Sequence, residues 1–214
     1  MKNLFGQESM LYQFLSLLAD IMILTLQWLI ACVPVVTIGA STTALYSCIM
    51  KLQKGDGVRL FRDFWTAFKS NFAQATGLWA VLILLLATAG ADIYLVFFTD
   101  FDPGTIGKVL MLMLVFVILM ISAYVFPLQA FFVNPVGRTL KNACLLAVMY
   151  LPVSVVITFV NLIPFLVWLI IPEFFTRTLF LWAALGAGCV AYINSKMFRR
   201  IFERHITKEP EEAS

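Results

Sequence analysis

The sequence has few charged residues, and this scarcity limits the kind of fold it can form. Charged residues make up 13% of the 214 residues, whereas hydrophobic residues make up 62%. A soluble domain contains about 25% charged residues. A soluble chain of this composition could not cover its surface with polar groups, so we expect lipid to cover much of the protein.

The residue types that build catalytic and metal sites are also scarce. His205 is the single histidine, and the four cysteines (Cys32, Cys48, Cys144 and Cys189) form no C-x-x-C pair. We expect these cysteines to be buried, reduced thiols, and the spacing offers no metal site. The sequence contains no G-x-S-x-G, H-E-x-x-H or phosphate-loop motif. We therefore expect no enzyme activity, no metal and no cofactor.

Five apolar segments are long enough to cross a membrane, which takes about 20 residues. They are residues 14–36, 73–98, 106–132, 143–171 and 179–194. The predicted fold is therefore all-α, a polytopic membrane helix bundle in one domain over residues 1–214. The fourth segment is either one kinked helix or a span preceded by an interfacial turn at residues 140–150, and we favour the second. Residues 205–214 form a charged tail that we expect to be disordered.

The basic residues are distributed unevenly between the two sides of this predicted bundle. With five spans, one side holds three Lys and Arg residues and the other holds twelve of the total of 15. Cytoplasmic loops are enriched in Lys and Arg. This asymmetry predicts an N-terminus outside and a C-terminus in the cytoplasm. Because the basic residues flank apolar runs, and do not cluster on a polar face, we expect no nucleic-acid binding.

Residues 37–72, between the first two spans, are too long and too patterned for a plain connector. The run from Lys54 to Gly57 predicts a turn, so we expect a cytoplasmic helical hairpin whose second helix covers residues 58–72. Aromatic residues recur at helical spacing along that second helix. Its aromatic and basic residues suit an anionic lipid surface, a groove on a partner, or the protein's own bundle, and the pattern does not choose among these. The candidate contact residues are Arg59, Phe61, Arg62, Phe64, Trp65, Phe68 and Lys69.

Polar and small residues inside the apolar segments form two further candidate sites. Asp20 and Asp92 lie within the first and second spans. A carboxylate inside a membrane is costly, so such a residue either lines a solute path or reaches water or a polar partner. Small residues in the fifth span are expected to let helices approach closely, within the chain or against another subunit; they are Ala183, Ala184, Gly186, Ala187, Gly188 and Ala191. Gln129, Asn161 and Asn194 are expected to form hydrogen bonds between helices.

Two runs of the sequence resemble a known family. The run from Pro34 to Tyr46 (PVVTIGASTTALY) and the run from Phe61 to Phe72 (FRDFWTAFKSNF) resemble the YesL-like family of bacterial membrane proteins of unknown function. Members of that family are often encoded beside oligosaccharide-importing ABC transporters. The resemblance implies a multi-pass protein of the bacterial cytoplasmic membrane with an accessory role in carbohydrate uptake. It supplies no established site residues.

Two functions from different classes follow from these observations. The first is an accessory or scaffold subunit that contacts membrane lipids and the permease subunits of a carbohydrate ABC importer. The second is a small solute transporter or channel that acts as a homo-oligomer, with Asp20 and Asp92 along its path. The sequence names neither the substrate nor the oligomeric state.

Overall fold

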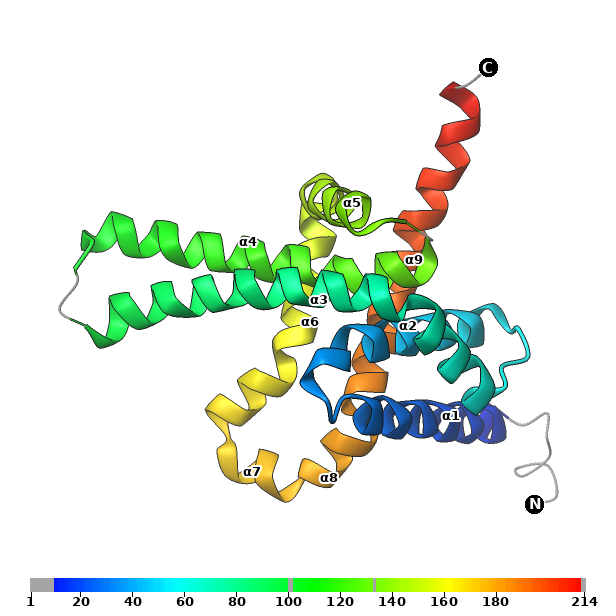
Figure 1. Cartoon of the computed structure of the whole chain (residues 1–214). Helices are drawn as coiled ribbons and strands as arrows, with labels where there is room; N and C mark the ends of the chain where they lie inside the picture. The colour runs from blue at the N-terminus through cyan, green and yellow to red at the C-terminus, as the bar shows by residue number, and fades with distance from the viewer. Residues whose placement is uncertain (1–9, 100–101, 133, 213–214) are drawn as a thin grey trace.

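The computed structural model describes residues 10–99, 102–132 and 134–212, with side chains described as far as Phe202 except that of Phe97. Every element in these ranges is helical. The helices form a bundle from which the paired α3 and α4 project as a long arm (Figure 1). In chain order the elements are α1 (Met10–Ala31), η1 (Val35–Thr37), α2 (Ile38–Lys54), α3 (Leu60–Phe98), α4 (Gly104–Phe131), α5 (Val136–Met149), α6 (Leu151–Ile170), α7 (Pro172–Arg177), α8 (Leu179–Leu181), η2 (Trp182–Gly186) and α9 (Ala187–Glu212).

Five helices in the described part of the chain are long and apolar enough to cross a membrane. Four of them correspond to predicted spans, namely Met10–Ala31, Leu60–Val96, Gly104–Phe131 and Leu151–Ile170. The fifth is Val35–Lys54, which we expected to lie in a cytoplasmic loop. The predicted span at residues 179–194 is not among the five; it is helical throughout, and consists of α8, the π-helical stretch Trp182–Gly186 and the start of α9.

The prediction of a separate helix at residues 58–72 is wrong in one respect. The turn is present, with Gly55 in the left-handed conformation at φ 76°, but the following helix does not end at Phe72. Helix α3 runs through 39 residues without a break. A fall in polarity is not a helix stop signal, and no proline interrupts this stretch. At about 1.5 Å per residue, the 39 residues extend about 58 Å, roughly twice the thickness of a bilayer's hydrocarbon core.

The segment at residues 143–171 is divided at Tyr150 into two helices, α5 and α6. This division agrees with a separate helical segment before the span. Pro152 lies in the first turn of α6, where the missing N–H costs little. At the other end of the chain α9 continues to Glu212, so residues 205–212, which we expected to be disordered, are helical, and residues 213–214 lie outside the described range.

Helix α2 occupies the centre of the bundle and packs most extensively against α3, with further contacts to α1, α4 and α9. The close α2–α3 approach depends on Gly39, where an added Cβ would lie 2.4 Å from the carbonyl oxygen of Ala75. Aromatic side chains from α4 and α9 complete the core. Tyr124, Phe198 and Phe202 are fully buried, and the rings of Tyr124 and Phe198 meet edge to face with centroids 4.9 Å apart.

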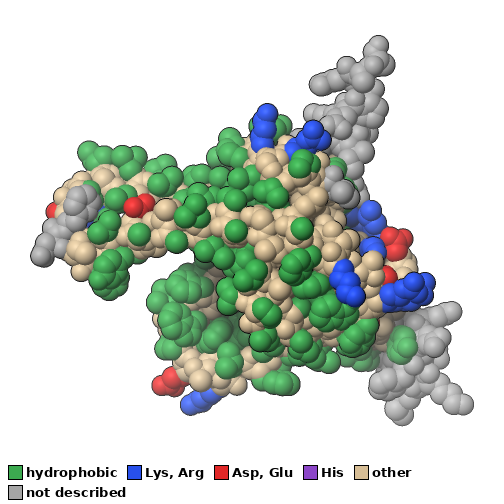
Figure 2. Space-filling model, in the orientation of Figure 1, with side chains coloured by type: hydrophobic (Ala, Val, Ile, Leu, Met, Phe, Trp, Pro, Cys, Tyr) green, Lys and Arg blue, Asp and Glu red, His purple; other side chains and the backbone are tan. Residues whose placement is uncertain are grey.

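Charged side chains mark the ends of the bundle. Lys and Arg side chains gather over the α2–α3 turn and over α5, whereas hydrophobic side chains cover most of the α3–α4 arm (Figure 2). Helices α1 and α2 run antiparallel. The described start of α1 therefore lies at the same end of the bundle as the basic α2–α3 turn (Figure 1).

Candidate functional site

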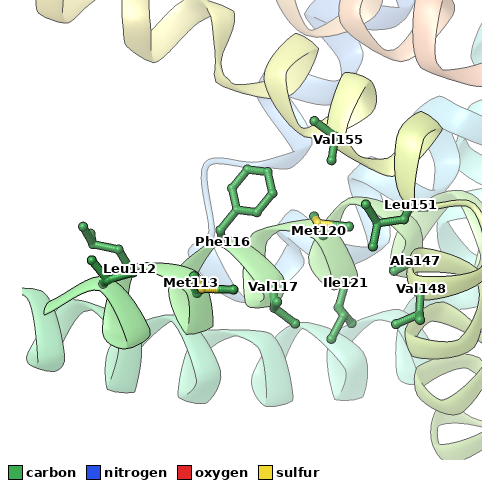
Figure 3. A pocket seen from close by; sticks show the side chains of 11 residues that line it. Leu112, Met113, Phe116, Val117, Met120, Ile121, Ala147, Val148, Leu151 and Val155 are labelled. Atoms are coloured by element: carbon green, nitrogen blue, oxygen red, sulfur yellow. The ribbon is translucent and has the colours of Figure 1, made fainter. Parts of the chain in front are cut away.

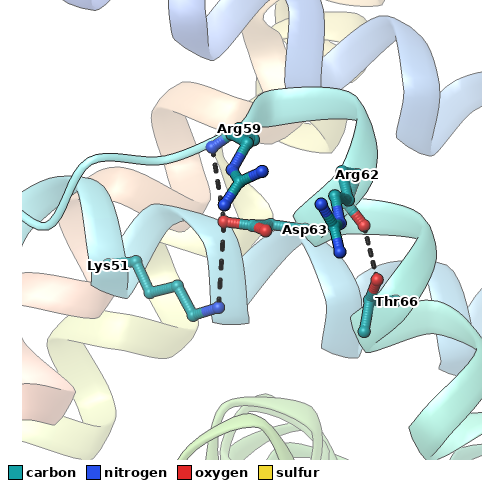
Figure 4. A network of polar contacts seen from close by, with 5 residues as sticks. All are labelled: Lys51, Arg59, Arg62, Asp63 and Thr66. Carbon is teal, nitrogen blue, oxygen red and sulfur yellow. Dashed lines mark hydrogen bonds and ion pairs between the residues drawn. The ribbon is translucent and has the colours of Figure 1, made fainter.

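The start of α3 is fixed by the carboxylate of Asp63. Its Oδ2 accepts a hydrogen bond from the backbone N–H of Arg59 at 3.3 Å and lies 4.0 Å from Lys51 Nζ (Figure 4). Backbone N–H groups at a helix start lack intrahelical partners, and a carboxylate there is favoured by the helix dipole. Asp63 thus links α3 to the end of α2. The guanidinium groups of Arg59 and Arg62 make no hydrogen bond or ion pair with the described residues.

The predicted aromatic stripe of α3 is divided between the core and the surface. Phe64 is fully buried, and Phe68 packs against the core. Phe61 and Trp65 are 65% and 37% exposed. The rings of Trp65 and Phe68 meet edge to face with centroids 5.4 Å apart. The inner part of the stripe therefore anchors α3 on α2, and the outer part remains available for contacts.

The outer part of the stripe surrounds a shallow recess with a volume of about 410 Å³. Aromatic residues and arginine are the types most often found at the energetic centre of protein interfaces. An exposed aromatic ring between two cations is also suited to an anionic lipid headgroup region. We call this recess the α3 surface; its lining residues are Phe61, Arg62, Trp65, Thr66 and Lys69.

The end of α2 beside the α3 surface is tied to the rest of the bundle. Gln53 donates from Nε2 to the carbonyl oxygen of Tyr192 at 2.7 Å, and its own carbonyl oxygen accepts from Arg199 Nη1 at 3.2 Å. Lys54 Nζ lies 5.5 Å from the ring centroid of Phe131. These contacts hold the α2–α3 turn against α9 and α4, so the α3 surface belongs to a rigidly supported element.

The two carboxylates that we expected inside the spans, Asp20 and Asp92, are not brought together. Asp20 is partly exposed on α1, and Asp92 is partly exposed near the end of α3. The last part of α3 lies in the arm with α4, away from α1 (Figure 1). Neither residue lines the recesses described here, so the geometry does not join them into one path within a single chain.

The small residues of the predicted fifth span lie in η2 and at the start of α9. An added Cβ at Gly188 would lie 2.2 Å from Thr25 Oγ1 and 2.7 Å from Ile21 Cγ2, so α9 approaches α1 closely there. Ala184 and Ala191 are buried on the same run. Gly186 faces its own helix instead, at Trp182. Ala183 and Ala187 are partly exposed.

Hydrogen bonds between amide side chains join the helices, as predicted. Gln129 Nε2 donates to Gln74 Oε1 at 2.7 Å, and Gln129 Oε1 accepts from Thr139 Oγ1 at 2.9 Å. Gln129 is 2% exposed, so these two hydrogen bonds fix α4 to α3 and α5 inside the bundle. A second bond joins Asn194 Nδ2 to Asn161 Oδ1 at 2.9 Å and links α9 to α6.

A polar recess of about 270 Å³ lies beside that second bond, between α2, α4 and α6. Sequence analysis missed this site, because its hydroxyl-bearing residues come from three separate helices. A signal was nevertheless present, since Pro127 interrupts the hydrogen bonding of an otherwise regular apolar span. The residues that line this polar recess are Thr42, Tyr46, Leu119, Ser122, Ala123, Phe126, Pro127, Thr158, Asn161 and Leu162.

A third recess is apolar and lies between α4 and the junction of α5 and α6 (Figure 3). Its volume is about 450 Å³, and Phe116, Met120 and Leu151 are among the side chains that line it. Every lining residue is aliphatic, methionine or phenylalanine. Such a groove offers no chemistry and matches the acyl chains of a surrounding bilayer.

Part of the chain is similar to a described family. Residues 21–93, which include the second half of α1, all of α2 and most of α3, match the model of a family described as "Protein of unknown function, DUF624". No match was found among curated proteins or among solved structures. The matched range contains both Gly39 and the α3 surface.

Proposed function

We propose that the protein is an accessory or scaffold subunit of the bacterial cytoplasmic membrane, associated with the permease of a carbohydrate ABC importer. The proposal includes membership of the YesL-like family, with which the match to residues 21–93 is consistent. The observation that carries it is the α3 surface, where Phe61 is 65% exposed beside Arg62, whose guanidinium has no ion-pair partner in the described part of the chain. A partner with an apolar pocket beside acidic side chains would complement such a surface.

The experiment compares two double variants of the tagged protein purified from its native membrane in mild detergent. Phe61→Ala with Arg62→Gln removes the centre of the α3 surface. Phe180→Ala with Arg177→Gln removes a matched pair at the opposite end, where Phe180 is 80% exposed. Phe64 is left intact because it is buried, and its replacement would test folding instead.

We expect permease subunits to co-purify with the wild type and with the control variant. Their recovery with the Phe61→Ala, Arg62→Gln variant should fall at least about tenfold, because interface hot spots contribute about 2 kcal/mol or more. If no permease subunit appears even after crosslinking, the scaffold proposal is wrong. Equal recovery with both variants would show that the α3 surface is not the contact.

The proposed orientation places the basic α2–α3 turn and α9 in the cytoplasm. The described start of α1 lies at the same end of the bundle as that turn (Figure 1), so this orientation does not fit the outside N-terminus that we expected. A membrane-impermeant maleimide tests each part separately on intact cells, in a background without native cysteines. Thr66→Cys should be protected and Thr176→Cys labelled. Met10→Cys tests the N-terminal side; protection of Met10→Cys would place the start of α1 with the basic turn and refute an outside N-terminus.

A second candidate is a small solute transporter or channel that acts as a homo-oligomer. The observation that favours it is the polar recess between α2, α4 and α6. Asp20 and Asp92 could line one solute path in such a protein only if Asp20 of one copy of the chain lies near Asp92 of another copy. Solute flux in proteoliposomes that survives Asp20→Asn and Asp92→Asn together would remove both carboxylates from the mechanism.

A further inference from the structure

The polar recess between α2, α4 and α6 combines hydroxyl and amide groups in an otherwise apolar part of the bundle. Its α2 wall contributes two hydroxyls. Thr42 Oγ1 accepts a hydrogen bond from Trp28 Nε1 at 3.1 Å, and the Tyr46 hydroxyl oxygen lies 3.5 Å from Asn194 Nδ2. Both hydroxyls serve as acceptors in these contacts, so their own hydrogens remain free to donate.

The opposite wall, from α4 and α6, offers acceptors instead. Ser122 and Thr158 donate their hydroxyl hydrogens to the carbonyl oxygens of Leu119 and Ser154, at 2.8 Å each. The oxygen lone pairs of both hydroxyls remain free to accept. Pro127 has no N–H, so the carbonyl of Ala123 lacks its usual helical donor, and both residues line the recess.

The exposed amide of Asn161 completes the polar lining. Asn161 Oδ1 accepts from Asn194 Nδ2, whereas Asn161 Nδ2 makes no hydrogen bond with the described residues. Asn194 is fully buried, and its Oδ1 has no hydrogen-bond partner among them. A buried amide oxygen without a partner costs about 1–3 kcal/mol. The lining of the recess therefore holds both donors and acceptors that lack partners among the described residues. Asn194 does not itself line the recess and is joined to it through Asn161.

The size and charge of the recess restrict what it can hold. No Asp, Glu, Lys, Arg or His lines it, and an ion would be costly to bury without an opposite charge. Its volume of about 270 Å³ equals that of about nine waters at about 30 Å³ each. This is room for roughly one six-carbon polyol and too little for an oligosaccharide.

We propose that the recess between α2, α4 and α6 binds a neutral polyhydroxyl group, either of a free solute or of a neutral glycolipid headgroup. Hydroxyl groups both donate and accept, so one ligand satisfies the donors of α2 and the acceptors of α4 and α6. This binding does not depend on the scaffold role, because the recess between α2, α4 and α6 and the α3 surface share no lining residue.

The test measures binding of tritiated sorbitol to the full-length protein in detergent and in nanodiscs. Sorbitol is expected to bind saturably in the millimolar range, and gluconate, its anionic analogue of equal size, at least about tenfold more weakly. Tyr46→Phe and Asn161→Leu should each weaken sorbitol binding about 3- to 10-fold, since each removes one hydrogen-bonding group.

Matched controls separate loss of binding from loss of folding. Tyr192→Phe and Asn71→Leu make the same chemical changes outside the recess, so they should bind sorbitol as the wild type does. The Tyr46→Phe change keeps the ring that packs edge to face on Phe198, so its elution profile should match the wild type. If either test variant misfolds, the other still decides the question.

Two further arms identify the source of the polyhydroxyl group. Displacement of sorbitol by nanodiscs that contain monoglucosyl diacylglycerol would assign the site to a lipid headgroup, and saturable binding without displacement would assign it to a free solute. The proposal is overturned if neither sorbitol nor the glycolipid binds saturably, if gluconate binds as well as sorbitol, or if the Tyr46→Phe and Asn161→Leu double variant binds normally.

Discussion

Replacing Gly39 by alanine should separate the two helices that form the centre of the bundle. An added Cβ would lie 2.4 Å from the carbonyl oxygen of Ala75 and 2.8 Å from the Cβ of Trp79. Both atoms are fixed to the backbone of α3, so neither can rotate away. The helices must therefore move apart, which loosens the most extensive contact in the fold.

The magnitude is best measured against a second glycine in a helix. Overpacking of this kind costs about 1–3 kcal/mol, whereas Gly→Ala in a helix interior gains about 1 kcal/mol in propensity. Gly90 lies within α3 with nothing within 4 Å of an added Cβ, so Gly90→Ala gains the propensity without the clash. Gly39 is the second residue of α2, so it gains less helix propensity than Gly90, and the two variants should differ by at least the cost of the clash, about 1–3 kcal/mol.

The assay is thermal unfolding of each variant in the same detergent, followed by tryptophan fluorescence. A difference of about 1–3 kcal/mol corresponds to about 2–12 °C in Tm for a chain of this size, with Gly39→Ala the lower. Equal Tm values for Gly39→Ala and Gly90→Ala would refute the close approach of α2 to α3, and with it the central position of α2.

Three further changes test other contacts. Gly188→Ala should lower Tm relative to Gly90→Ala, because its Cβ would meet α1 at 2.2 Å; an unchanged Tm would contradict the α1–α9 contact. Gln129→Leu should cost about 1–3 kcal/mol in thermal unfolding, because it leaves buried hydrogen-bonding partners unsatisfied. Lys108 Nζ lies 3.1 Å from Asp102 Oδ1 and, with the Gly104 N–H, lowers the pKa of that carboxyl below 3.8. Lys108→Met should raise this pKa in an NMR titration. The stability that the Asp102–Lys108 pair contributes should be present above pH 3.8 and lost as the pH falls through the lowered folded-state pKa.

Much of the helix content follows directly from hydrophobic run length. The spans at residues 106–132 and 73–98 coincide with apolar runs that helices α4 and α3 contain, and the turn at Gly55 follows from its local residues. The continuation of α3 through Phe72 could not be predicted from the sequence. The change from amphipathic to fully apolar sequence there marks a change in what surrounds the helix. The backbone conformation does not change there.

The polar recess could not be predicted because its residues are unremarkable when taken one at a time. Thr42, Ser122 and Thr158 each have an ordinary local environment, and two of them return a hydrogen bond to their own helix. Only the packing of α2 against α4 and α6 brings their free lone pairs and hydrogens together. The two asparagines were recognised as interhelical partners, but the partner of Asn161 is known only from the fold.

The sequence did not predict the central position of α2. In the most apolar part of Val35–Lys54, 56% of the residues are buried, compared with 17–28% for the other four long apolar helices. A helix surrounded by other helices needs no lipid-facing apolar surface, so it can carry Ser41, Thr43 and Tyr46 and still lie among spans. Its sequence is then hard to distinguish from that of an amphipathic cytoplasmic helix. The hydropathy of a helix depends on how much of its surface faces lipid. It does not report how deeply a helix such as α2 is buried among other helices.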